Sequence, residues 1–209
     1  MHDHETALLL FVVDENRLGA LSLILQQGFL IKADTGCSLS SFLMNRLGLS
    51  PDYIREKIQT IFLDGSPVDD LDSTIIKDGS HLALSAAMPG LVGAAMRRGG
   101  FYSTLRNSIT YKEAGKQLTL KEGTVHIKLF NLLMTDLGPH LLREGVLVQT
   151  SDLSIFLATR SESFWAGCRG IFLNEQPIDK DSLLKANGLA KYKMTYLIIQ
   201  CSTRIIHHG

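Results

Sequence analysis

The chain has 209 residues, and its 21 lysines and arginines balance its 21 aspartates and glutamates. This neutral balance argues against the basic class of nucleic-acid-binding proteins, and a hydrophobic content of 45% is that of an ordinary globular protein. The three cysteines are an odd number without C-x-x-C spacing, which argues against a disulfide framework and against a zinc ribbon.

The first apolar run, Ala7–Val13, is too short to span a membrane. Asp3 and Glu5 precede it, where a secretory signal would carry basic residues. We therefore interpret the run as a strand and expect a cytoplasmic protein with no membrane partner.

After this strand, the first half of the chain predicts a second strand, a helix and further strands. Ser38 or Ser40 is placed to cap the helix, and Gly48 is placed to end it. Asp64-Gly65 and Asp78-Gly79 are turn signals between the later strands. The expected elements are strands over Gly28–Ala33, Thr60–Leu63, Thr74–Ile76 and His81–Ser85, the capped helix, and a helical turn that begins at Pro51.

The second half of the chain repeats the markers of the first half in the same order and with shorter spacing. Two copies of one domain give this pattern when loops are shortened in the second copy. The matching markers are Leu10-Phe11 and Leu129-Phe130, Gly28-Phe29 and Gly145-Val146, Ile61-Phe62-Leu63 and Ile171-Phe172-Leu173, and Asp72-Ser73 and Asp181-Ser182. The expected elements of the second copy are strands over Val125–Leu129, Val146–Gln149, Gly170–Leu173 and Met194–Ile199 and a helix over Leu153–Arg160.

A two-stranded start, a helix laid across the sheet and a late return strand are the plan of a β-grasp domain. The first copy resembles the ubiquitin-like sulfur carriers of molybdopterin and thiamine synthesis. The resemblance is carried by Leu10-Phe11 in the first strand, by Ile61–Gly65 at a strand that ends in a turn, and by Lys77–Leu84 at the last turn and strand.

This resemblance extends over about residues 6–92 and, less closely, over residues 124–202. It implies an α+β protein of two tandem β-grasp domains, each with a small mixed sheet and one covering helix. We predict a first domain over residues 1–90, a connector that contains glycine and arginine over residues 91–122, and a second domain over residues 123–209.

The connector contains Gly99-Gly100, and sulfur carriers act through a terminal Gly-Gly whose carboxylate is activated. A glycine tail suits this role because it has no side chain to block a narrow channel. Here the pair is internal, since Phe101 follows it, so the carrier interpretation requires cleavage after Gly100. The other interpretation is that Gly99-Gly100 is a joint between the two copies.

The rest of the connector is more apolar than a solvated linker. We expect it to pack between the copies, to recognise a ligand or to insert into a partner. Exposed backbone N–H groups and nearby arginines also suit an anion, although the spacing of a P-loop is missing. The candidate ligand or partner contacts are Arg97, Arg98, Phe101, Tyr102 and Arg106.

The sequence contains no recognisable catalytic set, and we expect no metal site and no cofactor. Cys37 lies near a predicted helix start, but no histidine lies near it in sequence to act as a base. The first functional hypothesis is therefore a non-catalytic binding or scaffold protein that acts through a protein partner or a small ligand. The alternatives are a sulfur carrier that requires cleavage after Gly100, and a small-ligand module with a pocket between the copies.

Overall fold

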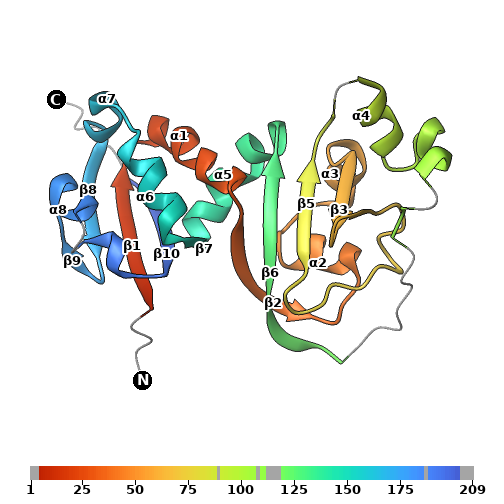
Figure 1. The fold of residues 1–209 in the computed structure, drawn as a ribbon, viewed down its shortest axis with the longest axis horizontal. Helices are drawn as coiled ribbons and strands as arrows, with labels where there is room; N and C mark the ends of the chain where they lie inside the picture. The colour runs from red at the N-terminus through yellow and green to blue at the C-terminus, as the bar shows by residue number, and fades with distance from the viewer. Residues whose placement is uncertain (1–4, 89, 107–108, 112–118, 186–187, 203–209) are drawn as a thin grey trace, which may run out of the picture. The chain divides into compact units, whose positions relative to one another are not determined.

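A computed structural model describes residues 5–88, 90–106, 109–111, 119–185 and 188–202 of the chain. The fold is a mixed α+β arrangement of strands and mostly short helices (Figure 1). The chain forms two compact units. Unit 1 combines residues 1–27 with residues 137–209, and unit 2 holds residues 28–136.

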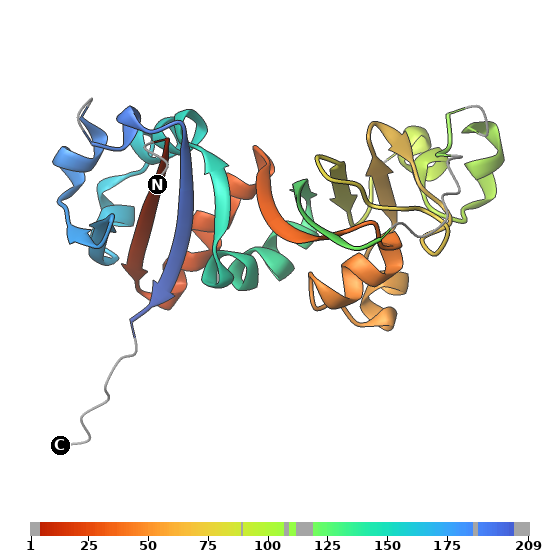
Figure 2. The same ribbon diagram turned by 90° about the horizontal axis from the view of Figure 1, so that it is seen from below.

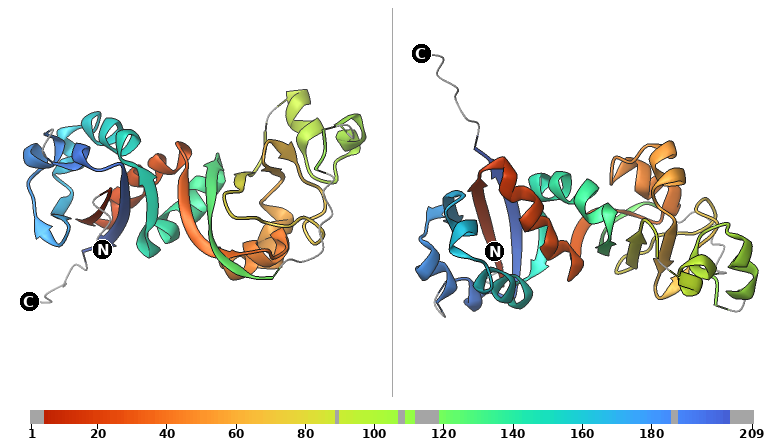
Figure 3. Two further views of the ribbon diagram at one scale, coloured as in Figure 1. Left: turned by 60° about the horizontal axis from the view of Figure 1, so that its bottom comes forward. Right: turned by 90° about the horizontal axis from the view of Figure 1, so that it is seen from above.

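The sheet of unit 2 has the strand order β4-β3-β5-β6-β2. Two of its inner strands, β5 and β6, run parallel to each other, and each is antiparallel to its other neighbour, β3 or β2. The left panel of Figure 3 shows β2 and β6 side by side along their length. The bounds are β2 Phe29–Thr35, β3 Thr60–Leu63, β4 Ser66–Pro67, β5 His81–Ser85 and β6 Lys121–Phe130.

Two short helices cover one face of this sheet, α2 over Leu39–Asn45 and α3 over Pro51–Glu56 (Figure 2). The Ser38 hydroxyl accepts a hydrogen bond from the Ser41 amide and so caps α2, as predicted. Pro51 begins α3, as predicted. The core between helices and sheet is apolar and consists of Phe29, Ile31, Leu39, Phe42, Leu43, Ile54, Ile61, Leu63, Leu82, Leu84, Val125, Ile127 and Leu129.

The sheet of unit 1 has the strand order β7-β10-β1-β8-β9. Its inner strands, β10 and β1, are parallel to each other and antiparallel to β7 and β8. Figure 2 shows β1 beside β10. The bounds are β1 Thr6–Val13, β7 Val146–Gln149, β8 Cys168–Leu173, β9 Gln176–Pro177 and β10 Met194–Cys201.

The core of unit 1 lies where alternate side chains of these strands meet its helices. Phe11 is fully buried, and its ring centroid lies 6.3 Å from that of Trp165. Gly138 is placed so closely against another helix that a Cβ there would lie 2.7 Å from the Cβ of Ser22. The helical segments are η1 Glu15–Arg17, α1 Leu18–Ser22, η2 Leu23–Gln26, α5 Leu132–Glu144, α6 Thr150–Ala158, α7 Glu162–Trp165, α8 Lys180–Leu184 and η4 Leu189–Lys191, and the first five residues of α5 belong to unit 2.

The units are assembled differently from the contiguous domains 1–90 and 123–209 that the repeat predicts. β1 lies in the predicted first domain, but it pairs with β10 and β8 of the predicted second domain. β6 begins at the border of the predicted second domain, but it pairs with β2 and β5 of the predicted first domain. The physical reason is that helical segments, rather than tight hairpins, link β1 to β2 and β6 to β7. A helical link leaves β1 and β6 free to pair with strands that are distant in sequence.

Candidate functional site

The residues singled out in the connector lie on two short helices of unit 2. α4 spans Gly90–Met96, η3 spans Phe101–Arg106, and the two pack against each other (Figure 1). Gly93 permits a close approach of the chain, because a Cβ there would lie 1.8 Å from the Met88 carbonyl oxygen. Gly99 has a φ of 61°, in the left-handed region that favours glycine. Part of the expected connector, residues 107–108 and 112–118, lies outside the described residues.

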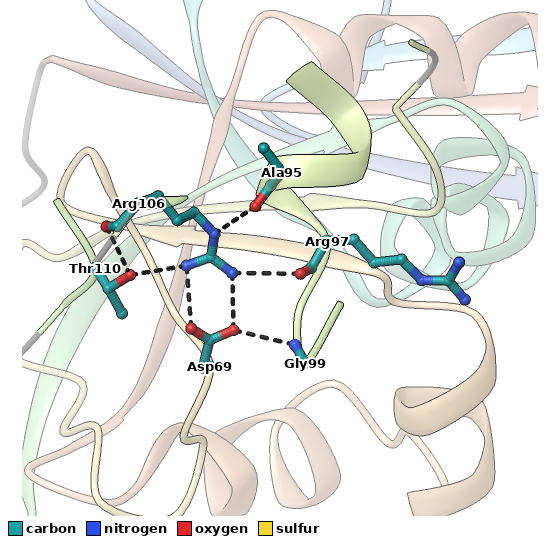
Figure 4. A network of polar contacts seen from close by, with 6 residues as sticks. All are labelled: Asp69, Ala95, Arg97, Gly99, Arg106 and Thr110. Atoms are coloured by element: carbon teal, nitrogen blue, oxygen red, sulfur yellow. Dashed lines mark hydrogen bonds and ion pairs between the residues drawn. The ribbon is translucent and has the colours of Figure 1, made fainter. Parts of the chain in front are cut away.

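Arg106 holds this segment together (Figure 4). Its side chain is only 3% exposed, and its two terminal nitrogens bind both carboxylate oxygens of Asp69 at 2.8 and 3.1 Å. The same guanidinium donates to the carbonyl oxygens of Ala95 at 2.7 Å and Arg97 at 3.3 Å and to the Thr110 hydroxyl at 2.9 Å. A planar fork of five N–H donors suits this geometry. Arg106 is therefore a structural anchor, and its guanidinium is already occupied by these partners.

Arg98 and Gly99 attach the connector to the body of unit 2. The Arg98 guanidinium donates to the Ile54 carbonyl at 2.9 Å, and the Arg98 amide donates to the Gln59 carbonyl at 2.7 Å. Burial lowers the pKa of the Arg98 side chain, while the Asp69 charge opposes that shift. The Gly99 amide donates to Asp69 Oδ1 at 3.2 Å. The turn between the two helices is thus fixed around one carboxylate.

Gly100 takes part in the same turn. Its amide donates to the Arg97 carbonyl at 3.2 Å, and its own carbonyl accepts from the Ser103 amide at 2.9 Å. The peptide bond between Gly100 and Phe101 therefore joins the turn to the first residue of η3.

Several other side chains of the segment face solvent. Phe101 is 89% exposed, Leu91 is 72% exposed and Val92 is 64% exposed, whereas large apolar side chains are usually buried. Tyr102 is also exposed, and its ring meets that of Phe101 edge to face at 5.2 Å. Arg97 is exposed as well. We call Leu91, Val92, Arg97, Phe101 and Tyr102 the connector surface.

The sequence around the connector surface contains arginines but lacks acidic residues. No acidic residue occurs between Asp78 and Glu113. Since Arg106 is buried on Asp69 and Arg98 is half-buried, Arg97 is the arginine of this segment that remains exposed. The connector surface is therefore apolar with a single exposed guanidinium.

Cys37 does not have the surroundings of a reactive thiol. It is buried, it lies within hydrogen-bonding distance of the Asp34 carbonyl at 3.4 Å, and burial raises its pKa. A small cavity of about 150 Å³ lies beside it. Within the described ranges, there is no cluster of three or more histidine, cysteine, aspartate or glutamate side chains able to hold a metal ion.

One pair of side chains was missed by sequence reasoning. His81 of β5 and His126 of β6 lie directly opposite each other, and their rings stack with centroids 4.3 Å apart. Burial lowers the pKa of His126, and the neighbouring His81 lowers it further. No sequence signal pairs these residues, because the pairing depends on the strand that β6 supplies to unit 2.

Comparison of the chain with protein-family models, with curated proteins and with solved structures gave no match. Among the helices that the structure describes, none has the length and apolar character needed to cross a membrane.

Proposed function

We propose that the protein is a non-catalytic binding protein that engages a protein partner through the connector surface. The observation that carries this proposal is the exposure of Phe101, Leu91 and Val92 on a segment that Arg106 fixes in place. Exposed apolar side chains on a segment that is held rigid favour association, because little conformational entropy is lost on binding.

The chemistry of the connector surface indicates the kind of partner. Aromatic residues and arginine are enriched in the energetically dominant parts of protein interfaces. Phe101 and Tyr102 supply the aromatic rings, and Arg97 supplies an exposed guanidinium. We therefore expect a partner with an apolar pocket and a carboxylate at its rim.

We also propose that both units are variants of the β-grasp fold, related to the ubiquitin-like sulfur carriers. In unit 2, β2 is followed by a helix packed on the sheet and then by β3, β4 and the late strand β5, which is the expected plan. The same order of β7, α6, β8, β9 and β10 supports the proposal for unit 1.

The sulfur-carrier role is the second candidate function, and it depends on cleavage after Gly100. In its favour, Gly99-Gly100 lies on the surface of unit 2 after β5. Against it, the amide and carbonyl of Gly100 are both hydrogen-bonded within a turn, whereas a carrier tail must extend. The intact mass of the protein from its native host tests this role. A species that ends at Gly100, with one oxygen exchanged for sulfur, would support it, and a full-length species alone would contradict it.

The cavities within each unit support a small-ligand role less than the exposed surface supports a protein partner. The cavity beside Cys37 measures about 150 Å³, and a groove along α6 near Phe156 and Arg160 measures about 280 Å³. Ligand sites usually measure about 300–1,000 Å³. A protein partner therefore fits the described surface better.

The proposed partner interaction is tested by site-specific photocrosslinking in the cells that produce the protein. A photoreactive phenylalanine analogue replaces Phe101 in one sample and Ile155 in a matched control, since Ile155 is an exposed apolar residue of unit 1. We expect a protein adduct at position 101 that is absent at position 155 and is lost in the Leu91→Ser, Val92→Ser double variant. The same adducts at both positions, or none at position 101, would contradict the proposal.

A further inference from the structure

Each half of the chain supplies an inner strand to the sheet of the other half. We call residues 5–111 the N-terminal half and residues 119–202 the C-terminal half. β6 comes from the C-terminal half and lies between β5 and β2 of the N-terminal half. β1 comes from the N-terminal half and lies between β10 and β8 of the C-terminal half. Neither sheet is complete within one half.

β6 is bound on both of its edges. Residues 121–127 pair with β2, and residues 126–130 pair with β5. Val125, Ile127 and Leu129 are fully buried in the core of unit 2. Removal of β6 would leave two strand edges unpaired and would open this core to water.

β1 is bound in the same manner in unit 1. Its whole length pairs with β10, and residues 9–13 pair with β8. Phe11 of the N-terminal half packs near Trp165 of the C-terminal half. At the end of the strand, both carboxylate oxygens of Asp14 accept from the Arg169 guanidinium, at 2.6 and 2.8 Å.

Further hydrogen bonds join the two halves within unit 2. The Asn131 side-chain amide donates to the Ser85 hydroxyl at 3.1 Å and to the Ala87 carbonyl at 2.8 Å. The Asp78 carboxylate accepts from the Thr124 amide at 2.8 Å. These bonds lie near opposite ends of the β5–β6 pair, so the joint between the halves is fixed along its length.

We propose that the two halves of the chain are binding partners of each other, so that the protein remains one particle when the connector is cut. Separation requires the extraction of an inner strand from each of two sheets, and both extractions break ladders on two edges. The proposal does not depend on what the connector surface binds. It also means that cleavage after Gly100 would leave the sheet of unit 2 complete.

The test uses the full chain with a specific protease site inserted between Tyr111 and Thr119. After complete cleavage, shown on a denaturing gel, native mass spectrometry at micromolar concentration measures the particle. We expect a single species that contains one copy of each fragment, with a mass near the 23.1 kDa of the uncut chain plus the insertion and with unchanged Trp165 emission. Two separated fragments, or precipitation of either fragment after the cut, would overturn the proposal.

Two variants of the cut protein make the test specific to strand insertion. Phe11→Ala weakens the packing of β1 in unit 1. We expect the fragments of this variant to separate at a lower urea concentration than those of the cut wild-type protein. Leu132→Ala truncates a side chain that is 67% exposed and serves as the control, with no change expected. Equal urea dependence for Phe11→Ala and the wild-type protein would also overturn the proposal.

Discussion

Units 1 and 2 place the inserted strand in different inner positions. In unit 2 the inserted strand β6 lies next to β2, and β5 lies next to β3. In unit 1 the inserted strand β1 lies next to β8, and β10 lies next to β7. The two inner strands are parallel in each sheet, so either one can form an antiparallel ladder with either outer neighbour. The two sheets therefore share the directions of their strands but not one strand order.

The two sheets also differ on the face that turns away from the buried core. In unit 1 this face is apolar and only partly exposed, and it includes Leu8, Leu10, Val12, Leu147, Phe172, Tyr196 and Ile198. In unit 2 it mixes the apolar Leu30, Phe62 and Ala83 with polar and charged residues, which are Lys32, His81, Thr124, His126 and Lys128. The two units thus both have apolar cores but differ in the chemistry of the other face.

The largest effect is expected where the N-terminal strand enters unit 1. Phe11→Ala removes a fully buried ring, and we expect a loss of about 3–5 kcal/mol in the free energy of unfolding. Urea denaturation followed by Trp165 fluorescence measures this loss, because the two rings are close. Phe130→Ala is the control, since Phe130 is 37% exposed and belongs to unit 2. An equal effect of the two substitutions on the Trp165 transition would contradict the assignment of β1 to unit 1.

The second-largest loss of stability is expected at Arg106, which anchors the connector in unit 2. Arg106→Lys keeps the positive charge but removes the planar fork that binds Asp69, so we expect a loss of about 1.5–3 kcal/mol in local stability. Hydrogen exchange of the amides in α4 and η3 measures this loss. Arg97→Lys is the matched control, because its side chain is exposed. Unchanged exchange in α4 for Arg106→Lys would show that the anchor does not hold the segment.

A smaller loss in the free energy of unfolding is expected when the pH is lowered, and it arises from His126 in unit 2. Burial lowers the pKa of His126 in the folded state, so the unfolded state takes up more protons below its usual pKa of about 6.5. Stability therefore falls as the pH drops through this range and does not depend on His126 well above it. We expect His126→Gln to reduce the loss of unfolding free energy between pH 7.5 and pH 5.5. An unchanged pH dependence would contradict the role of the His81–His126 stack.

The smallest stability effect is expected on the connector surface. Phe101→Ser and the control Ile155→Ser should each change the free energy of unfolding by less than about 0.5 kcal/mol, because both side chains are exposed. Only Phe101→Ser should reduce binding of a partner identified by crosslinking at position 101. A large loss of stability in Phe101→Ser would assign this residue to the fold rather than to binding.

Most strands were predictable because their side chains alternate or form short apolar runs. The strands over Thr60–Leu63, His81–Ser85 and Val146–Gln149 are confirmed with the expected bounds, and the cap at Ser38 is confirmed. The helix α5 was missed, and it contains Pro139, a residue that usually argues against a helix interior.

Strand pairing was not predictable, because alternation shows which side chains are buried but not which strand lies alongside. The Arg106 anchor was missed for a similar reason. Its partner Asp69 is 37 residues away in sequence and lies in a run of aspartates typical of turns. The positions of Gly99 and Phe101 in the connector were noticed from composition, whereas the helices that present them carry no clear signal of their own.

The exchange of strands between the halves is tested most directly by cysteine crosslinking. In a background with the three native cysteines replaced by alanine, the pair His81→Cys and His126→Cys is compared with the pair Ala83→Cys and Leu10→Cys. A short bismaleimide followed by peptide mass spectrometry reads out the link. We predict a rapid intramolecular link between positions 81 and 126, which face each other across β5 and β6, and none between positions 83 and 10. A link between positions 83 and 10, without a link between positions 81 and 126, would place β1 beside β5 within the N-terminal half. That result would contradict the account.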